Sequence, residues 1–350
     1  MSALAMPARP EQDANVRPLP LRRMIWVTWR QHRFALTGVA VLLGGLAVYV
    51  WLVGRHLHRA YAAASACHPT GSPVCSVLAS SFQSTDVQLS NGFVWQPVPA
   101  LIAAFLGAPL LARELETGTF RYAWTQGFGR RRWTLAKLVL LAITVTAAAG
   151  AFSVLLSWYY QPYFTAGNQD RFLTALSPLA SGLFDLRGVA FAAWTLAAFA
   201  IGALAGVLIR RVVPAIVATL AAYAGLALAS AMFLRQHYLT ALVTRNVNVP
   251  GSALVLSQWW TKGGQFAFGR APIGLLERIC PPPPPKAGPG NFSKSDFVGQ
   301  CLSRHGYTQL TSYQPASRFW SFQVIEGSWL LALSLLLIGV TVWLVHRRTA

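Results

Sequence analysis

The stretch RGVAFAAWTLAAFAIGALAGVLI, residues 187–209, decides the class of fold. After its first residue it carries no charge, and its apolar residues run continuously instead of alternating. A helix needs about 20 such residues to cross the roughly 30 Å of hydrocarbon in a bilayer. The strands of a membrane barrel would alternate between apolar and polar residues. The stretch therefore predicts a transmembrane helix.

Five further runs of the same kind occur along the chain. They cover residues 34–54, 93–112, 134–158, 212–233 and 327–345. The chain of 350 residues is 54% hydrophobic and only 11% charged, whereas about a quarter of the residues in soluble domains are charged. Lipid admits only helices or closed barrels, because every backbone polar group must find a partner inside the protein. The sequence predicts an all-α polytopic membrane protein with six transmembrane helices over residues 34–345.

The basic residues indicate how these helices are oriented. Lys and Arg are dense around residues 17–33 and 113–137 and less dense along the long segment 234–326. Such a bias marks the cytoplasmic side of a membrane protein. We expect both termini in the cytoplasm, with a disordered tail at 1–20, a short tail at 346–350 and an extracytoplasmic loop at 234–326. The formal net charge of +19 then reflects topology in the plasma membrane, and no nucleic-acid partner is needed.

Residues 21–33, next to the first apolar run, have an amphipathic pattern. At about 100° per residue, their arginines share one arc of a helical wheel and apolar residues fill most of the rest. This pattern predicts a helix in the membrane interface, with arginines toward lipid headgroups and tryptophans at the boundary. The residues concerned are Arg22, Arg23, Trp26, Trp29, Arg30 and Arg33. The alternative is a basic flank that only stops the first helix.

All four cysteines lie on the expected outer side of the membrane. Cys67 and Cys75 fall between the first two helices, and Cys280 and Cys301 fall in the loop 234–326. Disulfides form in that oxidising compartment. Of the three possible connectivities, the local pairs Cys67 with Cys75 and Cys280 with Cys301 are favoured. A zinc site would need closer Cys and His spacing, so we expect no metal.

Small residues recur on the fourth apolar run, which should let its backbone approach another helix closely. They are Ala198, Gly202 and Gly206. The sequence leaves open whether that helix belongs to the same chain or to a second copy. The second run carries Pro97, Pro99 and Pro109, which should bend it or interrupt its backbone hydrogen bonds.

The outer loop contains one more apolar segment. Residues 252–269 read SALVLSQWWTKGGQFAFG. We expect this segment to form short amphipathic or interface-hugging pieces and not a full span.

Chemistry that the sequence lacks excludes several function classes. The six runs contain no His, Asp or Glu, and their only charges are Lys137 and Arg187 near the ends. Ion-coupled carriers and intramembrane hydrolases need such groups within the membrane. A phosphate-binding loop needs G-x-x-x-x-G-K-[ST], yet Lys294, the one lysine followed by Ser or Thr, is preceded by Ser293 instead of Gly. We expect no enzymatic activity and no cofactor in this chain.

Residues 113–133, RELETGTFRYAWTQGFGRRRW, form a polar segment between the second and third runs. Residues 117–119 make a turn that can cap a helix, the next residues allow about two helical turns, and Gly127 and Gly129 end it. The aromatic side chains predict a docking element for a soluble partner. The expected contact residues are Glu114, Glu116, Gly118, Thr119, Phe120, Tyr122, Trp124, Gln126, Arg131 and Arg132. The alternative is a loop that rests on lipid headgroups.

The same segment resembles the cytoplasmic loop of permease subunits of type-2 ATP-binding-cassette (ABC) exporters. The matching positions are Glu116, Gly118, Thr119, Trp124, Thr125, Gln126, Arg131, Arg132, Trp133 and Lys137. Residues 21–33 are similar to the elbow helix of that family. The resemblance implies that two permease chains pair, as a homodimer or with a second permease. It also implies that separate cytoplasmic ABC ATPases, which would hold ATP and Mg, bind the loop as a coupling helix.

Two functions from different classes follow. The favoured one is a transmembrane permease that forms the substrate pathway of an ATP-driven ABC exporter. The alternative is a non-transporting membrane sensor or assembly protein that docks a soluble partner through the same loop. An ATPase that co-purifies with the chain and is stimulated by it would distinguish the two.

Overall fold

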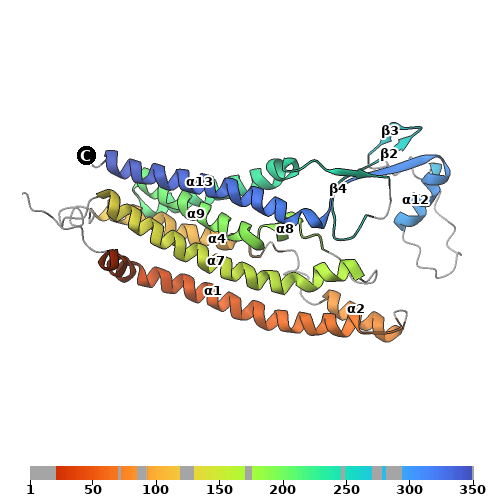
Figure 1. Ribbon diagram of the computed structural model, residues 1–350, viewed down its shortest axis with the longest axis horizontal. Helices are drawn as coiled ribbons and strands as arrows, with labels where there is room; N and C mark the ends of the chain where they lie inside the picture. The colour runs from red at the N-terminus through yellow and green to blue at the C-terminus, as the bar shows by residue number, and fades with distance from the viewer. Residues whose placement is uncertain are drawn as a thin grey trace, which may run out of the picture.

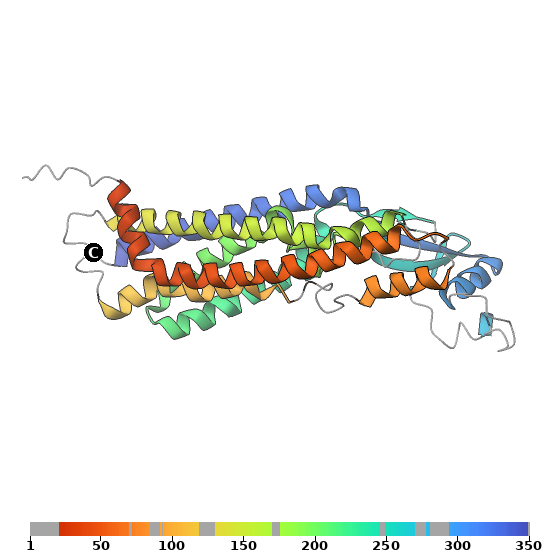
Figure 2. The same ribbon diagram turned by 90° about the horizontal axis from the view of Figure 1, so that it is seen from below.

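The protein is an elongated bundle whose long helices run close to parallel, with a small sheet at one end (Figures 1 and 2). The computed structural model describes residues 21–69, 72–84, 92, 94–118, 130–169, 176–245, 249–269, 278–280 and 294–348. The start of α1 (Leu21–Ser65) and the end of α13 (Phe319–Arg348) lie together at the end opposite the sheet. We call the end with the sheet the outer end and the other the loop end. The predicted tail 1–20 lies outside the described residues.

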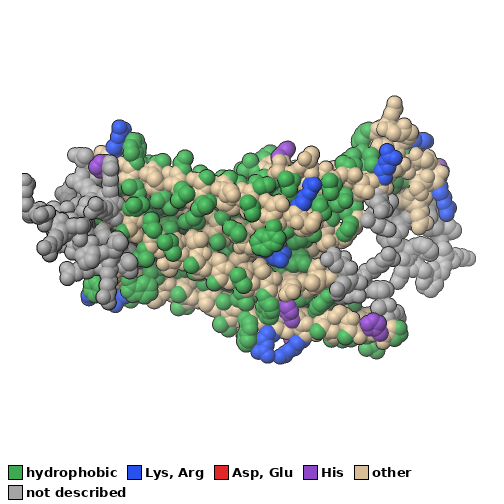
Figure 3. Space-filling model, in the orientation of Figure 1, with side chains coloured by type: hydrophobic (Ala, Val, Ile, Leu, Met, Phe, Trp, Pro, Cys, Tyr) green, Lys and Arg blue, Asp and Glu red, His purple; other side chains and the backbone are tan. Residues whose placement is uncertain are grey.

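Six described helices are long and apolar enough to cross a membrane, so the predicted number is confirmed. They are Trp29–Ser65, Pro97–Thr117, Trp133–Thr165, Gly188–Ile209, Val212–His237 and Ala316–Arg347. Hydrophobic side chains are spread along the whole flank in Figure 3, while Lys and Arg side chains lie at both ends and at a few places on the flank toward the sheet. This distribution is typical of a bundle that is surrounded by lipid.

The fourth span, α9 (Gly188–Ile209), lies at the centre of the bundle. It packs against α5 (Ala108–Thr117), α7 (Arg130–Gln169), α10 (Val212–Ala229) and α13. A helix that is apolar on every face is suited to this position, because it has no polar face to turn toward water.

The second span is broken into three pieces. A turn of π-helix, η1 (Ala103–Gly107), separates α4 (Pro97–Ile102) from α5. Pro109 lies at the start of α5 and has no N–H to donate to the preceding turn, which favours the wider π-helical turn there. The interruption that the prolines predict is therefore observed.

The first and third spans are longer than a bilayer requires. α1 has 45 residues and α7 has 40, so they extend about 68 and 60 Å, roughly twice the hydrocarbon thickness. Toward the outer end α1 packs beside α2 (Pro73–Ser84) and α7, and His58 stacks on Trp158 with ring centroids 4.5 Å apart. Figure 2 shows the first turns of α1 set at an angle to the rest. The elbow role of residues 21–33 stays a prediction.

A four-stranded antiparallel sheet lies at the outer end, so the prediction of an all-α fold is wrong. The strands, in the order β1-β4-β2-β3, are β1 Leu242–Thr244, β4 Tyr307–Gln314, β2 Leu254–Lys262 and β3 Gln265–Phe268. Gly263 and Gly264, with φ of 57° and 84°, make the two-residue turn between β2 and β3, a conformation that costs glycine little. The predicted amphipathic pieces in 252–269 are therefore a β-hairpin, because aromatic and β-branched residues flank a Gly-Gly turn.

Short helices lie between the spans and between the strands of the outer sheet. They are α8 Ser181–Phe184, η2 Ser230–Leu234, η3 Arg235–His237, α12 Lys294–Arg304 and η4 Ala316–Arg318. η2 and η3 continue α10 beyond Ala229, and η4 leads directly into α13. The fifth and sixth spans therefore extend further toward the outer end than their apolar runs do.

Candidate functional site

The two ends of the polar loop are joined inside the protein by an ion pair. The side chain of Lys137, on α7, is 1% exposed, and its ammonium donates to a carboxylate oxygen of Glu114 on α5. The ammonium also lies 4.7 Å from the centre of the Trp133 ring, whose face attracts a cation. A charge that is buried this deeply is retained only with such partners. We call Glu114, Trp133 and Lys137 the loop stem.

The second acid of the loop binds another span. Glu116 Oε2 accepts a hydrogen bond from the backbone N–H of Val212, with a donor–acceptor distance of 3.1 Å. Val212 is the first residue of α10, where a carboxylate satisfies a free N–H and faces the positive end of the helix dipole. The sequence predicts partner contacts for Glu114 and Glu116, yet in this structure both carboxylates bind within the chain.

Gly118 is the last described residue before position 130. Its φ of 70° is a left-handed conformation that side chains with a Cβ adopt only at a cost. An added Cβ would meet nothing within 4 Å, so the backbone conformation and not the available space requires glycine. Gly118 caps the end of α5. Five predicted contact residues lie outside the described residues, namely Thr119, Phe120, Tyr122, Trp124 and Gln126.

Several predicted basic and interfacial residues lie on the first turns of α1 and α7. Trp26, Trp29, Arg30 and Arg33 are exposed, and the Arg30 guanidinium lies 5.3 Å from the centre of the Trp26 ring. The side chains of Arg22, Arg23, Arg131 and Arg132 are outside the described part of the structure. The placement of α1 in the membrane interface stays a prediction.

The backbones of the second and fourth spans touch where the small residues of α9 lie. A Cβ added to Gly202 would stand 2.9 Å from both Ala103 O and Ala108 N, and one added to Gly206 would stand 2.6 Å from Ala108 O. Ala198, the third member of the row, is fully buried. The helix that the sequence left unassigned is therefore the second span of the same chain.

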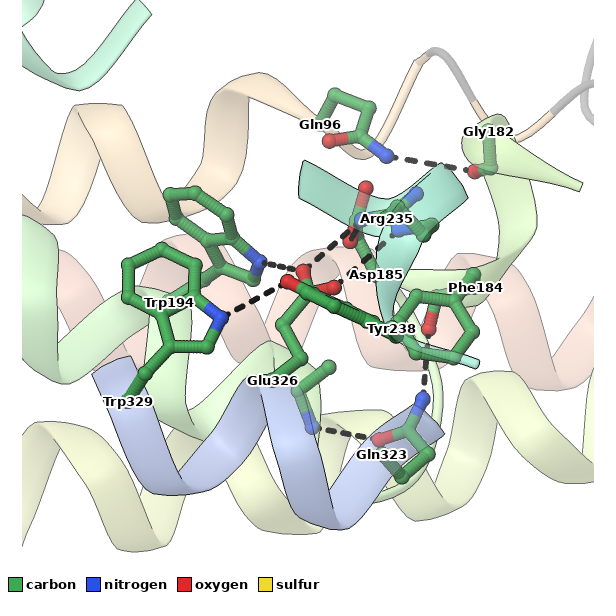
Figure 4. Close-up of polar contacts among 11 residues, drawn as sticks. Gln96, Gly182, Phe184, Asp185, Trp194, Arg235, Tyr238, Gln323, Glu326 and Trp329 are labelled. Atoms are coloured by element: carbon green, nitrogen blue, oxygen red, sulfur yellow. Dashed lines mark hydrogen bonds and ion pairs between the residues drawn. The ribbon is translucent and has the colours of Figure 1, made fainter. Parts of the chain in front are cut away.

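Three charged side chains meet near the outer ends of spans four, five and six. Arg235 donates from Nε and Nη2 to the two carboxylate oxygens of Glu326, at 3.2 and 2.9 Å, and from Nη2 to Asp185. Glu326 is fully buried and Arg235 is 5% exposed. The Arg235 guanidinium also lies 4.5 Å from the centre of the Phe184 ring. We call Asp185, Arg235 and Glu326 the outer charge cluster (Figure 4).

Neutral side chains hold this cluster in place. Trp194 Nε1 donates to Glu326 Oε1 at 2.8 Å. Nearly one turn earlier on α13, Gln323 accepts a hydrogen bond from the Ala190 N–H at 2.8 Å and donates to the Phe184 carbonyl at 3.0 Å. These contacts, drawn in Figure 4, fix α13 against the start of α9. Because the polar groups of Glu326 and Gln323 have partners, their burial is tolerated.

The sequence pattern does not reveal this cluster. Arg235 and Glu326 mark the two ends of the predicted loop 234–326, and the six apolar runs therefore contain no carboxylate. In the structure the fifth span continues to His237 and the sixth begins at Ala316. The prediction that the spans lack acidic groups is wrong for this reason, and also because the second span continues to Thr117 and includes Glu114 and Glu116. The opposite charges of Arg235 and Glu326 at the two ends of one loop are the sequence signal that indicates the cluster.

Asp185 makes the folding stability depend on pH. Burial raises its pKa to about 7; the Arg235 guanidinium opposes that shift and the Glu326 carboxylate adds to it. An unfolded chain has an aspartate pKa of about 3.9, so between about pH 4 and 7 the folded protein binds more protons than the unfolded one. Stability therefore rises as pH falls through 7.

We expect a higher melting temperature at about pH 6 than at about pH 8, and Asp185→Asn should remove much of that difference. An equal pH dependence in both proteins would contradict the shift.

The first five spans match a known family of membrane proteins. A model of the family described as ABC-2 membrane transporter related matches residues 39–235, more than half of the chain. The chain belongs to this family. No curated protein and no solved structure matches it. The matched region contains the loop stem and ends at Arg235, so the outer sheet and the sixth span lie beyond it.

Membership in the ABC-2 membrane transporter related family confirms the resemblance seen in residues 113–133. The protein is a component of membrane transport and a multi-pass membrane protein. The plasma membrane is the usual location of this family.

This ABC-2-related chain pairs its cysteines in the predicted way. Disulfides join Cys67 to Cys75 and Cys280 to Cys301, and both connect elements at the outer end. His305 lies near the second pair. Metals bind the thiolate form of cysteine, so two sulfurs that are joined to each other do not form a zinc site.

We expect iodoacetamide to modify no cysteine in the unreduced protein and all four after reduction, as counted by mass spectrometry. Cys280→Ser is the control, because it should leave one reactive thiol at Cys301. Modification of four cysteines without reduction would contradict the pairing.

Proposed function

We propose that this chain is the permease subunit of an ATP-driven ABC exporter. It forms the substrate pathway in the membrane and couples to a separate cytoplasmic ATPase, which holds ATP and Mg, through the loop 113–133. The loop stem is the observation that supports the proposal. Glu114 and Lys137 join the loop to spans two and three, and Glu116 joins it to span five. A force on the loop therefore reaches three spans at once.

A buried ion pair suits this role because it resists separation. An exposed salt bridge contributes at most about 1 kcal/mol, whereas breaking a buried pair typically costs about 3–5 kcal/mol. The side chain of Lys137 is 1% exposed and that of Glu114 is 18% exposed, so their pair belongs to the second class. The ends of α5 and α7 thus move together when the loop is displaced.

The source of energy and the kind of cargo follow from where charges lie. Between Lys137 of the loop stem and Arg187, two residues from Asp185 of the outer charge cluster, the six apolar runs contain no charged residue. Transport driven by ion gradients usually needs ionisable groups at that depth. An external ATPase supplies the energy instead, and a path without fixed charges suits a neutral or amphipathic cargo.

Trp124→Ala tests whether the loop binds the ATPase. The assay is co-purification of a cytoplasmic ABC ATPase with the full-length chain from its native membranes. Loss of an aromatic anchor at an interface typically costs at least about 2 kcal/mol, or roughly 30-fold in affinity. The control is Trp343→Ala, at an exposed tryptophan near the loop end of α13. Equal ATPase binding by the two variants, or no ATPase bound by the wild type, would refute the proposal.

A double variant, Glu114→Gln with Lys137→Met, tests whether the loop stem transmits the force. It removes both charges, so neither is left buried without a partner, and such replacements are often neutral for stability. We expect the double variant to fold and to bind the ATPase, while stimulation of ATP hydrolysis by cargo falls severalfold. Lys137→Met alone should be unstable, because it leaves the Glu114 carboxylate unpaired. Full stimulation in a folded double variant would exclude a coupling role for the stem.

A further inference from the structure

A groove of about 440 Å³ lies between α1 and α7, which run side by side along the bundle (Figures 1 and 2). Residues of α1 from Trp29 to Ala47 and residues of α7 from Thr144 to Leu155 line it. Apart from two threonines, every lining residue is apolar or glycine. Almost all of them belong to the apolar runs 34–54 and 134–158, so the groove lies at the depth of the hydrocarbon.

Small side chains leave this space open. Ala40, Gly44 and Ala47 recur every three or four residues on α1, and Ala148 and Ala151 do the same on α7. Residues with this spacing lie on one face of a helix, so each helix has a strip of small residues facing the groove. Ala40 and Gly44 are exposed, and a Cβ added to Gly44 would meet nothing within 4 Å. The groove is therefore accessible from the flank that faces lipid.

The dimensions of the groove match one lipid acyl chain. At about 30 Å³ for each water-sized group, its volume holds roughly 15 such groups, and a methylene is close to that size. From Leu36 to Ala47 the wall made by α1 is about 17 Å long. The hydrocarbon of a bilayer is about 30 Å thick, so one leaflet, which a single acyl chain crosses, is about 15 Å thick.

Positive charge lies where the groove approaches the loop end. Arg33 is one turn after Trp29 and one turn before Leu36, two residues that line the groove, so it lies on the same face of α1. Arg30 and Arg33 are both exposed, and α1 contains no acidic residue. The nearby carboxylate of Glu114 is already paired with Lys137. A phosphate at this level therefore meets two arginines and no opposing charge from α1.

We propose that this groove binds one anionic phospholipid from the leaflet at the loop end. One acyl chain lies along Ala40, Gly44 and Ala148, and the phosphate is bound by Arg30 and Arg33. The lipid fills the space between α1 and α7 and so becomes part of the bundle. The site does not rest on the proposed permease function, because lipid binding needs neither an ATPase nor a cargo.

Phosphatidylglycerol and phosphatidylcholine with identical acyl chains test the proposal, because only the first carries a net negative charge. The full-length protein is purified in detergent, and each lipid is titrated while bound lipid is counted by native mass spectrometry. We expect one phosphatidylglycerol to bind at least about tenfold more tightly than phosphatidylcholine, since each arginine near the membrane surface attracts anionic lipid. Equal affinities would overturn the proposal. So would the absence of lipid binding, either in a monomer or in a dimer whose second copy fills the groove.

Two adjacent glycines provide a matched pair of variants that locates the acyl chain. Gly44 lines the groove and Gly45 does not, and an added Cβ would meet nothing within 4 Å at either position. Gly44→Leu and Gly45→Leu should therefore both fold. Only Gly44→Leu places a side chain in the groove, so it should weaken phosphatidylglycerol binding at least about tenfold, because buried methylenes supply much of the affinity for a lipid chain. Equal binding by the two variants would exclude this groove.

A pair of double variants locates the headgroup. Arg30→Gln with Arg33→Gln should lower the affinity for phosphatidylglycerol to that for phosphatidylcholine. Arg55→Gln with Arg59→Gln removes two exposed arginines beyond the other end of the groove on α1, and should keep the preference. An unchanged preference in the first double variant would overturn the assignment of the phosphate. If that variant does not fold, the two glycine variants decide.

Discussion

Arg235→Met is expected to lower the free energy of unfolding by about 3–5 kcal/mol, the usual cost of removing one member of a buried ion pair. In this protein the removal leaves two carboxylates without a counter-charge. Glu326 is fully buried and loses two of its three hydrogen-bond donors, keeping only Trp194. Asp185 loses the one cation with which it pairs among the described residues. The measurement is the melting temperature of the purified protein, together with its yield from membranes.

Two further variants separate the role of the cluster from the loss of an arginine. Arg245→Met is the matched control, because Arg245 is exposed and lies in the same segment between spans five and six. The triple variant Arg235→Met, Asp185→Asn, Glu326→Gln removes all three charges and should recover most of the lost stability, since no buried charge is left alone. A stable single variant, or a triple variant no better than the single one, would show that the cluster is not held by its charges.

Gly206→Leu should separate the second and fourth spans. A Cβ at this position would stand 2.6 Å from the carbonyl oxygen of Ala108 and 3.2 Å from the amide nitrogen of Ala112. Both atoms belong to the backbone, so no side chain can rotate away. Overpacking in a core costs about 1–3 kcal/mol when side chains can adjust, and here the helices themselves must move apart. We expect a lower melting temperature and less protein in the membrane fraction.

The control for this prediction is the same substitution on another span. Gly225 of α10 is exposed, and an added Cβ there would meet nothing within 4 Å. Gly225→Leu should be tolerated or slightly stabilising, because glycine in a helix costs about 1 kcal/mol relative to good helix formers. Equal behaviour of the two variants would mean that the close approach at Gly206 is not needed for the fold.

The spans could be predicted because each one is encoded locally. The run 187–209 corresponds to α9, Gly188–Ile209, since a continuous apolar stretch of this length has one stable form in lipid. The outer sheet was harder to predict, because its central pairing joins Trp260 to Gln309, which are far apart in the chain. The Gly263-Gly264 turn is the local signal for the hairpin, but the apolar and aromatic residues around it also fit an interfacial segment.

Only part of the candidate site could be predicted, because sequence pattern reports on local structure and not on contacts between distant residues. Sequence pattern singled out Glu114 and Lys137, but periodicity identifies a helix face and not the residue that the face meets. The small residues of α9 predicted a close helix contact without identifying the other helix. Arg235 and Glu326 are separated by 91 positions, and each lies just beyond an apolar run. Their pairing depends on how far two helices continue past their hydrophobic segments, which hydropathy alone does not define.

The contact of spans two and four has a mechanical consequence. Because their backbones touch at Gly202 and Gly206, the two helices can turn only as one lever. Glu114 lies on one arm of this lever, on α5. Trp194, which binds Glu326 of the outer charge cluster, lies on the far arm, on α9. Trp194 lies 12 residues along α9 from Gly206, about 18 Å, so a tilt of about 10° moves it by about 3 Å. A shift of that size exceeds the range of a hydrogen bond, so a small rotation at one face of the membrane is sufficient to open contacts at the other.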